Sequence, residues 1–261
     1  MRLQSRPMKG LRLALLAPLL LLACDDPKKP DTQTTPSATV SVAATTPLPS
    51  ATSATPPPKK KEWKCSDGPT VDFMGDAALE ADVRLKLTKP KGDIAVADLA
   101  KVKSLNLTRA PVDELNPCIL PKFTGLHDLL IGKGELEDLT AVGTVSSLMS
   151  LRATDNRVTD LKPLAKLIHL DRLDVAHSQV RDLEPLRPLV ELTELSLDNT
   201  QITDVTPLAG LTKLEKLIIA NTMVKDLSPL KTLKNLKLLD ISGTPSTDYS
   251  MIPSPHMKVK M

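Results

Sequence analysis

The sequence contains few of the residues that build active sites and tight binding pockets. Only four of its 261 residues are aromatic (Trp63, Phe73, Phe123 and Tyr249), and only four are histidines. The strings Gly-x-Ser-x-Gly and His-Glu-x-x-His and the phosphate-binding glycine-rich loop are all absent. The composition therefore predicts neither an enzyme nor a site for a cofactor or a metal ion.

The sequence also lacks an apolar run long enough to cross a membrane. The longest, Leu13 to Leu22, has ten residues, whereas a membrane-spanning helix needs about 20. It follows a basic start and fits the apolar region of a secretory signal peptide. The end of this run and the two residues after it, Leu21-Leu22-Ala23-Cys24, resemble the lipobox of bacterial lipoproteins. This resemblance implies that residues 1–23 are removed and that Cys24 is acylated, which would anchor the protein to a membrane of the cell envelope. The alternative is an ordinary signal peptide in which Cys24 has no role.

No excess of one charge remains after Cys24. The chain has 34 Lys and Arg and 31 Asp and Glu, and four of the basic residues but none of the acidic ones precede Cys24: Arg2, Arg6, Lys9 and Arg12. The remainder carries a net charge of about −1, without the clustered basic face that nucleic-acid binding needs. We therefore expect no nucleic-acid partner.

Residues 24–62 contain too few large apolar side chains to form a core. Proline, threonine, serine and alanine dominate this stretch, a composition typical of an extended, solvated tether. With Cys24 acylated, two cysteines remain, Cys65 and Cys118. They either form one disulfide or stay as two separate thiols.

A 22-residue block recurs in constant phase along the second half of the chain. Blocks begin at Leu126, Leu148, Leu170, Leu192, Leu214 and Leu236, and one of them reads LTELSLDNTQITDVTPLAGLTK. Within it, Leu195-Ser196-Leu197 alternates as a short strand does, and Pro207 suits the first turn of a short helix or 3-10 segment. Every block carries an aspartate ahead of this turn: Asp138, Asp160, Asp182, Asp204, Asp226 and Asp248. We expect each to accept backbone N–H bonds at its own turn rather than to bind metal.

These blocks resemble the leucine-rich repeat of the internalin-like subfamily. The shared string is L-x-x-L-x-L-x-x-N/T-x-I-x-D-L-x-P-L-x-x-L, which residues 126–247 follow closely; residues 102–125 look like a first repeat with two extra residues. The resemblance implies an α/β fold: a right-handed solenoid, or horseshoe, with a parallel β-sheet on its concave face and 3-10 or short helical turns on its convex face. The repeats would then cover residues 102–247.

Both ends of the repeat array need cover, because a terminal repeat exposes half of its core. Residues 63–101 are expected to form an N-terminal cap. In it, Asp76 begins a helix that runs to about Leu87 with Leu79, Val83 and Leu87 on one stripe. Residues 248–261 depart from the repeat pattern, and we expect them to cover the opposite edge of the sheet.

The outward strand positions form the candidate binding face. One column runs Asp128, Ser150, Arg172, Glu194, Lys216, Leu238, and the next runs Leu130, Arg152, Asp174, Ser196, Ile218, Asp240. His177 should lie beside them near Asp155 and Asn199, and Asp198 also points outward. This face is interpreted in two ways: as a mixed-charge surface that binds a protein partner, or as a solvated surface of a passive envelope component. None of the four aromatics falls on it, so we expect a weak or transient contact. We also expect the protein to be a monomer.

Overall fold

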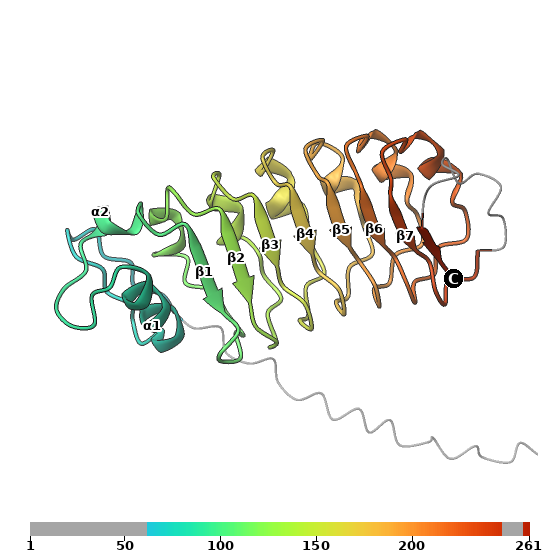
Figure 1. Ribbon diagram of the computed structural model, residues 1–261. Coiled ribbons are helices and arrows are strands. Elements are labelled where there is room, and N and C mark those ends of the chain that lie inside the picture. Colours follow the sequence, from blue (N-terminus) through green and yellow to red (C-terminus); the bar gives the residue numbers. More distant parts are fainter. Residues whose placement is uncertain (1–61, 247–257) are drawn as a thin grey trace, which may run out of the picture. The chain divides into compact units, whose positions relative to one another are not determined.

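Eight short parallel strands form one sheet whose strand order follows the sequence (Figure 1). The computed structural model describes residues 62–246 and 258–261. The strands are β1 (Ser104–Leu107), β2 (Asp128–Ile131), β3 (Ser150–Arg152), β4 (Arg172–Asp174), β5 (Glu194–Ser196), β6 (Lys216–Ile218), β7 (Leu238–Asp240) and β8 (Lys258–Lys260). Residues 1–61, and with them Cys24 and most of the tether, lie outside the described residues.

The sheet register reproduces the 22-residue period of the sequence. From β2 to β7, each residue pairs with the residue 22 positions later, so Leu129, Leu151, Leu173, Leu195, Leu217 and Leu239 form one stack. Each of these leucines is at most 1% exposed. The step from β1 to β2 is 24 residues, as expected for a first repeat with two extra residues. A one-residue slip would turn the whole stack outward, and this explains why the register is so strongly determined.

A row of 3-10 turns lies on one side of the sheet (Figure 1). The other side, which we call the open face, carries the outward strand positions. They are η1 (Leu120–Lys122), η2 (Val142–Thr144), η3 (Lys162–Lys166), η4 (Glu184–Leu186), η5 (Thr206–Gly210) and η6 (Ser228–Thr232). A proline stands in the first turn of all but η2, where its missing N–H costs nothing.

The repeated aspartates cap these turns. Asp160 Oδ1 accepts the N–H of Lys162 at 2.8 Å, and Asp204 Oδ1 accepts that of Thr206 at the same distance. Asp138, Asp182 and Asp226 do the same in their own coils, and Asp248 lies outside the described residues. The five described aspartates therefore have the local role expected of them.

The turn after each of the strands β3 to β7 places one residue in the left-handed region of backbone space. Asp155, His177, Asn199, Asn221 and Gly243 occupy this position, with φ between 53° and 71°. Aspartate, asparagine and glycine tolerate this conformation best, so the turn itself explains most of the residue types in the row. In the coils of β3 to β6 the next residue along is a buried hydrogen-bonding group: Thr200 Oγ1, for example, donates to the carbonyl of Leu197 at 2.6 Å.

Helix α1 (Ala77–Lys86) packs at the β1 end of the sheet. Asp76 caps it by accepting the N–H of Leu79 at 3.0 Å, and Leu79 and Val83 join the core of the repeats. Asp82 is only 5% exposed, and its Oδ2 accepts the backbone N–H of Asn106 in β1 at 2.8 Å. A side chain thus replaces the strand that would otherwise pair with that edge. A second helix, α2 (Val96–Leu99), follows and was not predicted.

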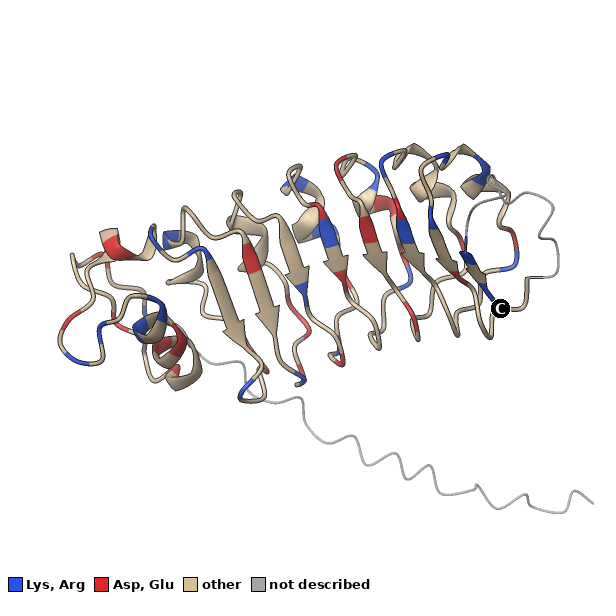
Figure 2. Ribbon diagram, viewed as in Figure 1, with Lys and Arg blue, Asp and Glu red and all other residues tan. Residues whose placement is uncertain are grey.

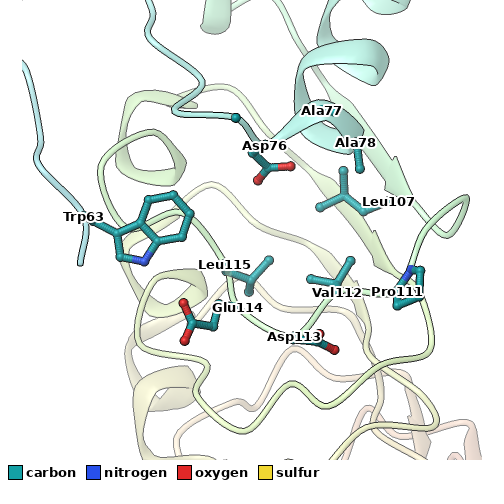
Figure 3. A pocket seen from close by; sticks show the side chains of 11 residues that line it. Trp63, Asp76, Ala77, Ala78, Leu107, Pro111, Val112, Asp113, Glu114 and Leu115 are labelled. Carbon is teal, nitrogen blue, oxygen red and sulfur yellow. The ribbon is translucent and has the colours of Figure 1, made fainter. Parts of the chain in front are cut away.

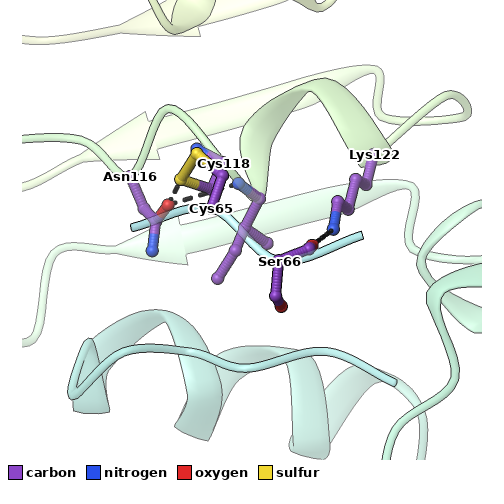
Figure 4. The surroundings of a disulfide bond; sticks show 6 residues. Cys65, Ser66, Asn116, Cys118 and Lys122 are labelled. Carbon is purple, nitrogen blue, oxygen red and sulfur yellow. Dashed lines mark hydrogen bonds between the residues drawn. A yellow bond between two sulfur atoms is a disulfide. The ribbon is translucent and has the colours of Figure 1, made fainter. Parts of the chain in front are cut away.

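A disulfide joins Cys65 to Cys118, whose Cα atoms lie 5.1 Å apart (Figure 4). Asn116 Oδ1 accepts the backbone N–H groups of Cys118 and Ile119, which orders the loop around the bridge. Lys122 Nζ donates to the carbonyl of Ser66 at 2.9 Å. The segment before α1 is therefore held to the first repeat by a covalent bond and by a hydrogen bond beside it.

At the other end, β8 pairs with β7 in parallel, with Leu239 opposite Val259. This adds one strand to the sheet beyond the last repeat. The remainder of the predicted covering tail, residues 247–257, lies outside the described residues.

Candidate functional site

The candidate binding face is the open face of the sheet, on which two columns of side chains project away from the leucine stack. The register places Asp128, Ser150, Arg172, Glu194, Lys216 and Leu238 side by side. A second column follows the order Leu130, Arg152, Asp174, Ser196, Ile218 and Asp240. The predicted columns are therefore correct in composition and in order, because both follow from the constant period of the strands.

Charges of opposite sign meet across neighbouring strands of this face (Figure 2). Arg152 Nε lies 3.2 Å from Asp174 Oδ2, and Lys216 Nζ lies 3.5 Å from Glu194 Oε2. The side chains of Arg152 and Lys216 are 58% and 43% exposed, so each pair adds at most about 1 kcal/mol to stability. The face is consequently a mixed-charge surface whose ion pairs contribute little to the stability of the fold.

Arg172 departs from the expected pattern. Its backbone pairs with Glu194, as predicted, but its guanidinium Nε lies 3.5 Å from Asp171 Oδ2 in its own coil. Asp171 stands just before β4 and also accepts a hydrogen bond from the Thr193 hydroxyl at 2.6 Å. Sequence reasoning missed Asp171, although its position directly before a strand could have revealed it.

Two aspartates of the second column have shifted pKa values. Burial raises the pKa of Asp174, and the nearby negative charge of Asp198 raises it further. The hydrogen bond from the Ala176 N–H and the positive charge of Arg152 act in the opposite direction. For Asp240, burial acts in the same direction, but hydrogen bonds from Ser242 and Lys260 outweigh it and lower the pKa. Lys260 Nζ in β8 lies 3.0 Å from Asp240 Oδ2, so the last strand supplies a counter-charge to this face.

His177 lies at the edge of the open face among polar side chains, as the repeat pattern predicts. Its Nδ1 is 3.9 Å from Asp155 Oδ1, and its Nε2 is 3.5 Å from Asp198 Oδ2 and 3.2 Å from Asn199 Nδ2. Ser196 Oγ donates to Asp198 Oδ1 at 2.8 Å, which connects this group to the second column. Ser150 and Asp128 lie farther along the sheet, and Ile218 and Leu238 are half-buried near its other end.

Two further observations concern the part of the chain that the structure describes. Within residues 62–246 and 258–261, no group of three or more His, Cys, Asp or Glu side chains is arranged to hold a metal ion. In the same residues, no helix is both long enough and apolar enough to cross a bilayer.

Comparisons with known proteins agree with this architecture. The family described as leucine-rich repeats (2 copies) matches residues 190–232. No curated protein matches the chain. An internalin (inlF) from Listeria monocytogenes has a similar structure, with a TM-score of 0.63 and 24% identity over 67% of this chain and 52% of that one. The chain thus spans about half the length of that internalin.

Two other solved structures extend the comparison. Internalin C2 from Listeria monocytogenes gives a TM-score of 0.66 and 29% identity over 70% of this chain and 82% of its own. A leucine-rich repeat protein from Leptospira interrogans gives a TM-score of 0.53 and 19% identity over 64% of this chain and 50% of its own, a likeness of fold alone. With its 22-residue coils, its single parallel sheet and its row of 3-10 turns, the chain contains leucine-rich repeats and is similar in fold to internalin C2.

Proposed function

We propose that the protein is a cell-envelope lipoprotein whose leucine-rich repeats bind a protein partner on the open face of the sheet. The observation that carries the proposal is the register of the two outward columns. It places Arg152, Arg172 and Lys216 on one continuous surface with Asp174 and Glu194. A solenoid scaffold suits this role because it presents a long surface instead of a pocket.

The charges of the face support a contact that depends on matching a second charged surface. Arg152, Arg172 and Lys216 have side chains between 43% and 58% exposed, and their acidic neighbours lie on the same surface. Exposed pairs of this kind exchange partners at little cost in free energy. Charge complementarity of this type governs specificity and association rate more than affinity.

Charge reversal on the open face tests the binding proposal. A photo-crosslinking residue at Ser196 should capture a partner in intact cells, and Arg152→Glu combined with Arg172→Glu should remove the crosslinked product. Lys162→Glu is the matched control, because Lys162 belongs to η3 on the opposite side and is 76% exposed. A product that survives the double reversal unchanged would favour a passive envelope component over a binding protein.

The anchor rests on the sequence before the described residues. Leu21-Leu22-Ala23-Cys24 lies at the end of an apolar run that four basic residues precede, the arrangement of a lipoprotein signal. Cys24→Ser should move the protein from the membrane fraction to the soluble fraction, and mass spectrometry of the wild type should find an acylated N-terminal cysteine. A membrane-bound Cys24→Ser variant would contradict the anchor without affecting the binding proposal.

A further inference from the structure

A cavity of about 380 Å³ lies at the β1 end of the sheet, apart from the two columns of the open face. It is formed between the start of α1, residues 75–78, and the loop of residues 111–115 that follows β1 (Figure 3). Trp63 lines it from a third segment. A volume of this size accommodates one side chain or a small organic molecule.

The cavity combines an apolar floor with an aromatic wall. Leu107, Val112 and Leu115 are 4%, 8% and 8% exposed and form the floor, whereas the Trp63 side chain is half-buried. Cys65, two residues after Trp63, is bonded to Cys118. The disulfide therefore limits how far the indole ring can move from the cavity.

Three carboxylates belong to the lining, and none of its eleven residues is basic. Asp76 Oδ1 accepts the N–H of Leu79, and Asp113 Oδ1 accepts the N–H of Glu135, both at 3.0 Å. These bonds hold two of the carboxylates in place. Glu114 lies beside the indole of Trp63 in Figure 3. Asp76 also offsets the positive end of the α1 dipole, so the lining as a whole favours a cation.

We propose that this cavity binds an arginine side chain of a partner protein. The aliphatic stem would lie on the floor of Leu107, Val112 and Leu115 while the guanidinium faces the carboxylates. A guanidinium pairs with carboxylates through two parallel bonds, which an ammonium group does not do, and its planar group also stacks on an indole ring. The inference is independent of the binding proposed for the open face.

Trp63 is the only tryptophan of the chain, so its fluorescence reports on this cavity alone. The full chain with its disulfide intact is titrated with N-acetyl-arginine methylamide. A saturable change in Trp63 emission is expected, with a dissociation constant on the order of 1 mM. The citrulline analogue, which has the same shape without the charge, should produce no saturable change.

Variants separate a specific site from general charge attraction. Glu114→Gln and Asp113→Asn should each weaken arginine binding about tenfold, as expected for the loss of a charge-assisted hydrogen bond. Glu137→Gln removes an exposed carboxylate outside the lining and should leave binding unchanged. Circular dichroism confirms that each variant is folded. Equal binding of the citrulline analogue, or equal weakening by Glu137→Gln, would overturn the proposal.

Discussion

Truncation of one leucine in the middle of the stack measures how strongly the coils depend on one another. Leu195 is 1% exposed and lies between Leu173 and Leu217 of the neighbouring strands. Leu195→Ala removes the equivalent of three methyl or methylene groups, at about 0.8 kcal/mol each. The cavity left behind adds about 1 kcal/mol more, so we expect the free energy of unfolding to fall by about 3–4 kcal/mol.

Urea denaturation followed by circular dichroism checks this value, with the slope compared between variants to verify that the same surface unfolds. Glu194→Ala is the matched control in the same strand, because its side chain points outward and its ion pair with Lys216 is exposed. It should cost less than about 1 kcal/mol. A loss below about 1 kcal/mol for Leu195→Ala would refute the shared leucine core.

Three more predictions follow from individual contacts. Replacement of Cys65 and Cys118 by serine opens a loop with a sequence separation of 53 residues and should lower the free energy of unfolding by about 4 kcal/mol in the chain-entropy model, as measured by urea denaturation with and without a reductant. Asp204→Ala removes the acceptor for the N–H of Thr206 and should cost about 1 kcal/mol, whereas the exposed Gln201→Ala should be nearly neutral in the same assay. Hydrogen bonds from Lys101 and Lys89 lower the pKa of Asp98 to about 2. The stabilisation from Asp98 is therefore complete above its ordinary value of 3.8 and is lost as the pH falls through about 2. An NMR titration should show this midpoint, and combined Lys89→Ala and Lys101→Ala should return it toward 3.8.

The repeats were predictable because one periodic constraint acts on every coil. A stack position that held an aliphatic residue in one coil and a polar residue in the next would disrupt the core. The phase of Leu129, Leu151 and Leu173 therefore determines the register to the residue. The role of the aspartates was predictable for the same reason, since each acts within its own turn.

Features that depend on side-chain conformation or on non-repeating segments were less accessible. Arg172 follows Asp171 in the sequence and lies opposite Glu194 in the sheet, and periodicity cannot tell which carboxylate its guanidinium approaches. Helix α2 is four residues long, too short to leave a periodic pattern. The cavity beside Trp63 is built from three separate segments, so only the folded chain brings its carboxylates together.

The constant spacing of the coils has a genetic consequence. Leu192 and Leu214 occupy the same position in successive blocks. Loss or duplication of residues 192–213 would therefore keep the 22-residue phase, and every remaining strand would pair with its neighbour in register. Unequal recombination within such a gene could therefore lengthen or shorten the exposed sheet in whole coils while α1 and β8 stay attached to the two ends.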